Sequence, residues 1–280
     1  MRFEKWEALG NDYAIVEAAM LPWELTPGRI RRLCEPHSGI GSDGILLLSR
    51  TNDERYVAEL RIFNPDGSEA ELSGNGAREA VLYLCRSGWT DREEFVILTK
   101  AGEIRPTITG PDTATIAMGR ASVTSPDYPS GGRDGTGRIE AGGREWSFQH
   151  VSVGNPQCVI EAGEEVEDLD LGEIGPEIER SGLFPNRTNV AFIRIEGSTV
   201  RARIFERGVG ETLSSGTGAS GAAVAAFLRG ALSPITVRLD GGELRVEITG
   251  DLDVRLTGSA SCVYRAELSD ELVRELAAVA

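Results

Sequence analysis

The sequence predicts an α+β protein of two pseudo-symmetric lobes, each a curved, mostly antiparallel sheet or barrel around one central helix. Three observations lead to this fold class. Two segments of the chain recur in the same order, each copy combines strand-length apolar runs with one enclosed helix, and a Gly/Pro-rich stretch follows the first copy. A chain of 280 residues is also long enough for two domains that each bury a core.

The internal repeat consists of two matches at nearly the same offset. GNDYAIVEA begins at Gly10, and GNPQCVIEA begins 144 residues later at Gly154. FNPDGSEAELSGNGAREAVLYLCRSG begins at Phe63, and FERGVGETLSSGTGASGAAVAAFLRG begins 142 residues later at Phe205. Because both matches keep their order and spacing, we infer a duplicated domain with a pseudo-twofold relation between its halves.

Each copy contains one stretch that is predicted to form a helix buried on all sides. The stretches 77–86 and 219–228 are apolar on nearly all sides, and such a helix must be covered all round. A sheet that curls around the helix would cover it. Gly88 and Gly230 are placed to end the two helices.

Runs of strand length, either apolar or alternating, accompany each helix. In the first copy they are 13–18, 43–49, 56–63 and 93–99, and in the second copy 147–154, 157–162, 189–195 and 199–205.

The division into lobes is placed at a segment rich in Gly, Pro, Ser and Asp, residues 110–138. We expect an N-terminal lobe of residues 1–118 plus 263–280, a C-terminal lobe of residues 119–262, and an active-site cleft between them.

Two further segments have local signals. The acidic run 163–180 is expected to form a solvated helix together with the segment that leads into it. The last stretch, SDELVRELAAVA, is expected to form a helix capped by Ser269 that packs back on the first lobe.

Composition excludes several classes of function. The net charge of −15 disfavours nucleic acid and anionic membranes as partners, because both require a basic surface. The four cysteines are widely spaced, which is typical of free thiols in a reducing compartment. With His37 and His150 as the only histidines, no metal site is expected. Neither a signal-peptide core nor a membrane-spanning run is present, so we expect a cytoplasmic protein.

The chemistry is expected where SGNGA and SSGTGA meet the two helices, with Ser73 aligned to Ser215 by the repeat. A helix start offers backbone N–H groups and a partial positive charge, and glycines allow a carboxylate or phosphate to approach closely. A serine before glycines is also a common helix cap. Two such turns at equivalent positions of a duplicated fold favour a functional pair. Neither turn matches a nucleotide-binding fingerprint.

Six motifs resemble those of the diaminopimelate epimerase family in order and spacing. They are GND at Gly10, GIGSDG at Gly39, RIFNPDGSEAELSGNGAR at Arg61, GNP at Gly154, RTNVAF at Arg187 and FERGVGETLSSGTGA at Phe205. The resemblance implies two similar lobes, each a curved sheet around a central helix, with the active site between them.

The resemblance also implies a cofactor-independent reaction, the epimerisation of LL-diaminopimelate to the meso form for lysine and peptidoglycan synthesis. In the family, one thiolate removes the α-proton and a thiol on the opposite face returns a proton. No cofactor is expected, and Lys100 lacks the surroundings of a pyridoxal-phosphate lysine. The implied partners are the small amino-acid substrate and a second copy of the chain in a homodimer.

The resemblance assigns the two acid/base positions to Ser73 and Ser215, with Glu206 helping to set protonation. It assigns substrate binding to Asn11, Asn64, Gly74, Asn75, Asn155, Asn189, Glu206, Arg207, Gly216 and Thr217. The four glycine-turn positions would hold the α-carboxylate, Asn11 would lie near the reacting centre, and Asn64, Asn155, Asn189 and Arg207 would hold the distal amino-acid end. Taken alone, the asparagines would be interpreted as turn formers and the Glu206–Arg207 pair as exposed.

The sequence departs from the family at the two acid/base positions, which are normally cysteine. A serine hydroxyl is a far weaker acid than a thiol and needs an activating partner. Gln157 stands where the family usually has histidine, and Gly44 where some members have glutamine.

Three hypotheses remain open at this point. The chain is an epimerase inactivated or weakened by replacement of sulfur with oxygen at both positions. Alternatively, it is a natural serine-dependent racemase or dehydratase of another amino acid, such as a hydroxyproline. The third hypothesis is a non-catalytic relative that binds an amino acid.

Overall fold

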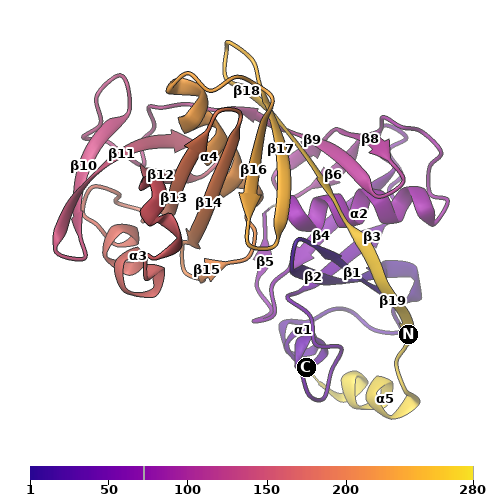
Figure 1. The fold of residues 1–280 in the computed structure, drawn as a ribbon. Coiled ribbons are helices and arrows are strands. Elements are labelled where there is room, and N and C mark those ends of the chain that lie inside the picture. Colours follow the sequence, from indigo (N-terminus) through magenta and orange to yellow (C-terminus); the bar gives the residue numbers. More distant parts are fainter. Residues whose placement is uncertain (72, 280) are drawn as a thin grey trace. The chain divides into compact units, whose positions relative to one another are not determined.

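The computed structural model describes residues 1–71 and 73–279 and divides into two compact units (Figure 1). The first unit comprises Met1–Ile116 with Gly258–Ala280, and the second comprises Ala117–Thr257. The predicted α+β class with two lobes is confirmed. Over the described residues the strands form two mixed sheets with open strand orders, so neither sheet is a closed barrel.

The first sheet contains eight strands in the order β19-β1-β2-β3-β4-β6-β7, with β5 paired to β4, and all of them belong to the first unit. The strands are β1 (Arg2–Ala8), β2 (Asn11–Glu17), β3 (Ile45–Ser49), β4 (Ala58–Phe63), β5 (Glu69–Ala70), β6 (Ile97–Thr99), β7 (Gly102–Ile104) and β19 (Ser261–Glu267). Its helices are η1 (Ala18–Met20), α1 (Pro27–Cys34), α2 (Gly74–Arg86) and α5 (Asp270–Ala278).

The second sheet runs in the order β10-β11-β12-β13-β14-β16-β17-β18-β9-β8, with β15 paired to β14. The strands are β8 (Pro106–Gly110), β9 (Thr113–Arg120), β10 (Thr136–Ala141), β11 (Arg144–Ser152), β12 (Pro156–Glu161), β13 (Asn189–Glu196), β14 (Thr199–Glu206), β15 (Gly210–Thr212), β16 (Ile235–Leu239), β17 (Gly242–Ile248) and β18 (Asp253–Ser259). By residue range, β8 and the first half of β9 belong to the first unit. The second unit holds η2 (Gly163–Glu167), α3 (Leu171–Glu179) and α4 (Gly216–Leu228).

The strand pairing of the first unit recurs in the second, strand for strand. The series β1-β2-β3-β4-β6-β7 corresponds to β11-β12-β13-β14-β16-β17, and the short strands β5 and β15 pair at equivalent places. The parallel pairs also correspond, since β2–β3 and β4–β6 match β12–β13 and β14–β16. Parallel neighbours require a crossover, and in both units a helix supplies it. This repetition supports the duplication inferred from the sequence.

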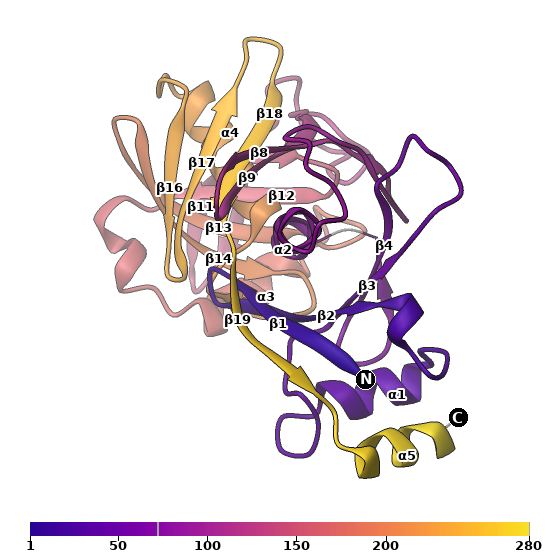
Figure 2. The ribbon, with the colours of Figure 1, turned by 90° about the vertical axis from the view of Figure 1, so that its right-hand side faces the viewer.

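The two predicted central helices are present and are buried. Both begin three residues earlier than expected, at Gly74 and Gly216. Figure 2 shows α2 end-on, with the strands of the first unit curving around it. Helix α4 contacts strands β11 to β14, β16 and β17, and its small side chains allow those strands to approach. Gly88 and Gly230 follow the helix ends with φ of 70° and 97°, as predicted.

The C-terminal helix α5 packs on the first unit, as the sequence predicts. Its cap is Ser269, whose side chain accepts a hydrogen bond from the Leu272 N–H at 3.3 Å. Leu276 is fully buried and belongs to the same core as Ile30 and Leu33 of α1. Figures 1 and 2 show α5 beside α1. None of the helices described is both long and apolar enough to cross a membrane.

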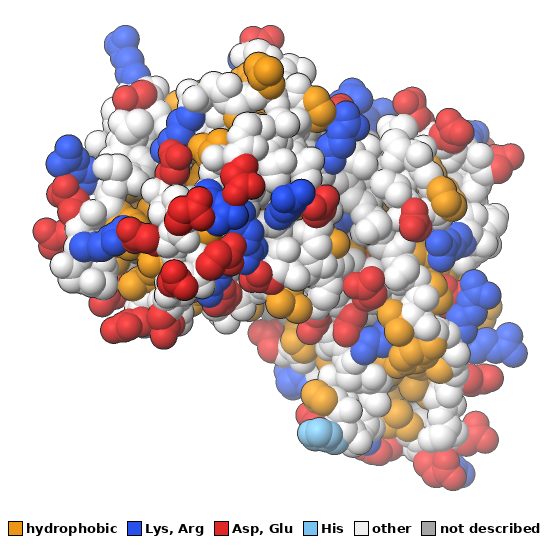
Figure 3. Space-filling model, viewed as in Figure 1, with side chains coloured by type: hydrophobic (Ala, Val, Ile, Leu, Met, Phe, Trp, Pro, Cys, Tyr) orange, Lys and Arg blue, Asp and Glu red, His pale blue; other side chains and the backbone are white. Residues whose placement is uncertain are grey.

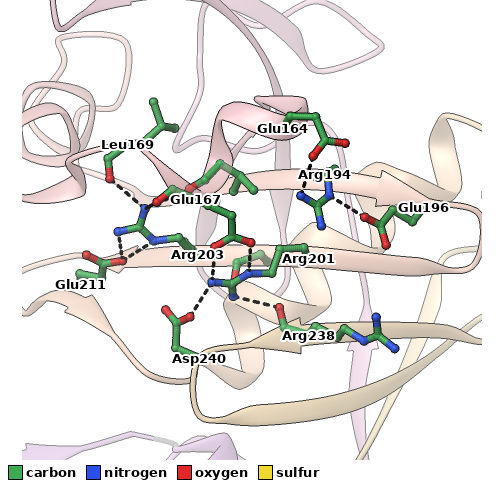
Figure 4. Close-up of polar contacts among 12 residues, drawn as sticks. Glu164, Glu167, Leu169, Arg194, Glu196, Arg201, Arg203, Glu211, Arg238 and Asp240 are labelled. Carbon is green, nitrogen blue, oxygen red and sulfur yellow. Dashed lines mark hydrogen bonds and ion pairs between the residues drawn. The ribbon is translucent and has the colours of Figure 1, made fainter.

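The outer face of the second sheet has a mixed-charge network (Figures 3 and 4). Arg201 contacts Glu167 at 2.8 Å and Asp240 at 2.5 Å, and Arg194 contacts Glu164 at 3.0 Å. The acidic run therefore partly covers strand arginines. The expectation that it is solvated throughout is wrong at its end, because the Glu179 side chain is only 3% exposed.

Candidate active site

The first serine turn lies between β5 and α2 in the first unit. Ser73 is the N-cap of α2 and has extended backbone angles, φ −129° and ψ 124°. Its Oγ accepts a hydrogen bond from the Gly76 N–H at 3.1 Å, which is the usual capping contact. The same oxygen also accepts one from the Tyr13 hydroxyl at 3.3 Å. Tyr13 comes from β2 and is 6% exposed, and it is not among the site residues predicted from the sequence.

A directed chain of hydrogen bonds orders the amides beside this turn. Arg78, fully buried on α2, donates to the Gly74 carbonyl at 3.1 Å and to Asn75 Oδ1 at 2.6 Å. Asn75 Nδ2 then donates to Asn11 Oδ1 at 3.4 Å, and Asn11 Nδ2 donates to Asp43 Oδ2 at 2.9 Å. The structure thus brings Asn11 and Asn75 together, with each amide oriented by its partners.

Burial has changed the acidity of two groups on α2. The pKa of Arg78 is lowered to about 10, chiefly by desolvation, and the Glu79 carboxylate opposes that change. Burial likewise holds the pKa of Glu79 well above its usual range. Both Glu79 oxygens lack a hydrogen-bond partner among the described residues. Neither group was expected from the sequence, where this helix is interpreted as apolar.

The second serine turn has the same cap but a different partner. Ser215 is the N-cap of α4, with φ −146° and ψ 122°, and its Oγ accepts a hydrogen bond from the Gly218 N–H at 3.2 Å. Its hydroxyl donates to Glu206 Oε2 at 3.2 Å. Thr212 donates to the other carboxylate oxygen at 2.9 Å. Ser215 is 4% exposed, and Glu206 is the half-buried last residue of β14.

The predicted helper Glu206 is therefore in hydrogen-bond contact with one of the two serines. Burial raises the pKa of its carboxyl, and the hydrogen bonds from Thr212 and Ser215 partly offset that effect. A carboxylate with a raised pKa is a better proton acceptor than an exposed one. The pair of Ser215 and Glu206 can thus accept a proton at the serine oxygen while passing the hydroxyl proton to the carboxylate.

Thr217 and Asn155 lie together beside the second turn. Asn155 Nδ2 donates to Thr217 Oγ1 at 3.2 Å, and Gln157 Nε2 donates to Asn155 Oδ1 at 2.7 Å. Gln157 is fully buried against Gly221 of α4, where an added Cβ would lie 2.8 Å from Gln157 Cγ. The residue in the usual histidine position therefore orients the Asn155 amide.

The remaining predicted residues are held in turns of their own. Asn64 Nδ2 donates to Ser68 Oγ at 2.9 Å. Asn189, 5% exposed, donates to the Pro156 carbonyl at 3.0 Å and accepts from the Arg207 N–H at 2.9 Å. The Arg207 guanidinium is exposed and donates to the Asn186 carbonyl at 2.9 Å. Asn189 and Arg207 are thus brought together.

The first turns of α2 and α4 are suited to an anion. Their leading N–H groups have no acceptor within the helix and carry the positive end of its dipole. Gly74 and Gly216 at the first helical position keep the backbone open to a ligand. Each turn, considered within its own unit, therefore combines a serine hydroxyl with backbone N–H groups that are suited to a carboxylate.

Comparisons with known proteins agree with these features. A family model described as diaminopimelate epimerase matches residues 3–124 and 149–263. The "Diaminopimelate epimerase 2" of Nostoc sp. is 39% identical over 278 residues, covering 97% of this chain and 97% of that protein. The diaminopimelate epimerase of Moorella thermoacetica is 39% identical over 282 residues, covering 95% and 99%.

Solved structures of other enzymes are similar in fold. A hydroxyproline epimerase from Agrobacterium vitis with bound trans-4-hydroxy-L-proline has a TM-score of 0.66 and 18% identity, covering 95% of this chain and 91% of that one. A proline racemase described as probable, from Agrobacterium radiobacter, has a TM-score of 0.68 and 16% identity, covering 96% and 93%. At these identities the likeness shows the fold alone.

Proposed function

The chain belongs to the diaminopimelate epimerase family and is by family an amino-acid epimerase or racemase, and we propose that it converts LL-diaminopimelate to the meso form. The observation that carries this proposal is the contact between Ser215 and the half-buried Glu206, because serine needs an activating partner to accept a proton. The reaction would serve lysine and peptidoglycan synthesis.

In the proposed reaction, Ser215 and Ser73 are the two proton-transfer groups at the α-carbon. The starts of α2 and α4, at Gly74 with Asn75 and at Gly216 with Thr217, bind the α-carboxylate. They stabilise the negative charge that develops as the proton leaves. Replacement of a thiol by a hydroxyl raises the barrier, so the activity is weaker than that of a cysteine form.

The distal amino-acid end of the substrate is assigned to the polar residues around the second turn and the β4 end. They are Asn64, Asn155, Asn189 and Arg207, and Asn11 is assigned to the reacting centre. Arg207 is exposed, so its guanidinium is accessible to a carboxylate.

A second candidate is a serine-dependent racemase of a smaller amino acid. It is favoured by the hydrogen bonds that already occupy Asn64 and Asn189, since these amides are then less available to a second amino-acid head. A substrate without that head would not require them.

We also propose that the chain forms a homodimer. Strand β19 ends the first sheet and exposes Val263 and Tyr264, at 53% and 40%. An edge strand with exposed apolar side chains favours pairing with another chain. Sedimentation of the purified chain beside V263D tests this, and a monomeric parent chain would contradict it.

The decisive test of function is α-proton exchange in deuterated water. Diaminopimelate would be incubated with this chain and with the double variant S73C/S215C, and deuterium incorporation followed by NMR. We expect slow exchange by the serine form and a large gain in the cysteine form. If the cysteine form stays inert with diaminopimelate but exchanges proline or hydroxyproline, the second candidate is correct. Binding of diaminopimelate without exchange by either form would indicate a non-catalytic receptor.

A further inference from the structure

Ser73 Oγ is the acceptor in both of its hydrogen bonds, so neither of them uses the hydroxyl proton. A serine oxygen has two lone pairs and one proton. The Gly76 N–H occupies one lone pair and the Tyr13 hydroxyl the other, at 3.1 and 3.3 Å. The proton of Ser73 is then available to a third group, such as a substrate atom.

The Tyr13 ring that makes this contact is buried and lies against the backbone of Gly44. Tyr13 is 6% exposed, and an added Cβ on Gly44 would lie 2.7 Å from its Cε1 atom. The same added Cβ would clash with the Phe63 carbonyl oxygen, so the backbone of β4 and the Tyr13 ring together leave room only for glycine at position 44.

The Ser215 oxygen has the opposite arrangement. Its proton is directed to Glu206, and the Gly218 N–H occupies one lone pair, so the other lone pair is available to accept. The two serines therefore cap their helices in the same way but differ in what remains for a ligand. Ser73 has its proton available to donate, whereas Ser215 has a lone pair available to accept.

We propose that Tyr13 is a positioning residue that makes Ser73 the proton donor of the pair and supplies the proton that restores it. The inference rests on the proposed epimerase function and deepens it. It assigns a direction to the reaction, with proton removal at Ser215 and proton return at Ser73, when Glu206 is ionised and Tyr13 is neutral.

The proton transfers balance as follows. The α-carbon C–H bond breaks, its proton forms an O–H bond on Ser215, and the former Ser215 proton passes to Glu206, leaving a carbanion. The Ser73 O–H bond then breaks as a new C–H bond forms on the other face. The Tyr13 proton moves to the Ser73 oxygen, because a phenol, with a pKa of about 10, is a stronger acid than an aliphatic alcohol. Solvent then returns a proton to Tyr13 and takes one from Glu206.

The activity test compares exchange with inversion in Y13F. With the substrate isomer that is deprotonated at Ser215, we expect inversion to fall by about 10²-fold or more, whereas α-proton exchange with retention changes little. The loss should be in kcat rather than KM. An equal fall in exchange and inversion, or no change in either, would overturn the proposal.

A second test requires no turnover. S73C and S215C each place one thiol in a turn, and its ionisation is followed by the pH dependence of iodoacetamide alkylation, with peptide mapping to separate it from the four native cysteines. A hydrogen bond to a thiolate lowers the thiol pKa. Adding Y13F should raise the midpoint at position 73 by about 0.5 to 1 pH unit and leave position 215 unchanged.

Two control variants match the Y13F test, one at the Ser215 turn and one at another tyrosine of the first unit. E206Q should lower the midpoint at position 215 only, because a neighbouring carboxylate opposes the thiolate. Y83F removes another buried phenol of the first unit, one that donates to Glu17 at 2.7 Å, and should change neither midpoint. An unchanged midpoint at position 73 in Y13F would overturn the proposal. The expected shift in a chain inert toward diaminopimelate would support the Tyr13 contact and overturn the proposed function instead.

Discussion

The starts of α2 and α4 have the same backbone and different chemistry. At both, a serine in extended conformation caps the helix through the third residue after it, Gly76 or Gly218. At α2 the serine oxygen accepts a second hydrogen bond, from Tyr13, whereas at α4 the serine donates to Glu206. The duplication has thus kept the serine-capped helix start, and the two copies have diverged in the side chain that contacts the serine.

The helix interiors differ as well. The repeat aligns Glu79 of α2 with Gly221 of α4, so a buried ionisable group in one helix corresponds to a glycine in the other. In α4 the buried residues are alanine, glycine, valine and serine, whereas α2 also buries Arg78 and Glu79. Charged groups support the first turn from within its helix, whereas the second turn depends on residues from β12 and β14.

The largest expected effect is on α-proton exchange when Glu206, the partner of Ser215, is changed. E206Q should reduce α-proton exchange by about 10²- to 10⁴-fold, because the amide cannot take the Ser215 proton. Since burial raises the pKa of Glu206, exchange by the parent chain should fall as the pH is lowered through that raised value, and this acidic limb should be absent in E206Q. E211Q, which changes a neighbouring carboxylate bonded to Arg203, is the control. Equal losses in both variants would contradict the assigned role.

The next effect compares the capping glycines. An added Cβ at Gly218 would lie 2.6 Å from Ile204 Cδ1, whereas at Gly76 it would lie 3.0 Å from the flexible end of Leu46. We expect G218A to lower the free energy of unfolding by about 1–3 kcal/mol and G76A by less. Denaturant unfolding of both variants measures this. A larger cost for G76A would contradict the packing described around the two turns.

The two caps themselves should be nearly equal in stability. S73A and S215A each remove one capping acceptor, and each should cost about 1 kcal/mol in denaturant unfolding. Costs that differ severalfold would show that the two serines are not equivalent as caps.

Replacing Glu79 is expected to change how the free energy of unfolding depends on pH. Because burial raises its folded-state pKa above the unfolded value, its contribution to stability is fully present below the unfolded pKa and is lost as the pH rises toward the folded pKa. E79Q cannot ionise, so its stability should fall less over that pH range, as chemical unfolding at several pH values would measure. Parallel curves for E79Q and the parent chain would contradict the burial of an ionisable carboxyl.

The sequence predicted the features that local patterns determine. The duplication, the two enclosed helices, their glycine ends and the Ser269 cap follow from periodicity and capping preferences within short windows. The strand predicted at 93–99 is shorter in the structure, where β6 spans only Ile97–Thr99. Its length depends on pairing with β4, which lies far away in the sequence.

The contacts that distinguish the two serines could not be predicted in the same way. Tyr13 lies 60 residues from Ser73 in the sequence, and an aromatic residue in a strand is ordinarily a core residue. The Arg78–Asn75–Asn11 chain likewise joins β2 to α2. Such contacts depend on the register of β2 beside the helix start, which a single sequence does not specify. The signal available was the tyrosine directly after Gly-Asn-Asp.

The most direct test of the account is stereospecific exchange in deuterated water by S73A and S215A. The substrate would be each isomer of diaminopimelate, with deuterium incorporation and inversion measured together. The account predicts that S215A loses both exchange and inversion of the isomer deprotonated at that turn, whereas S73A retains exchange without inversion. Exchange that survives in S215A and is lost in S73A would contradict the assignment of Ser215 as acceptor and Ser73 as donor.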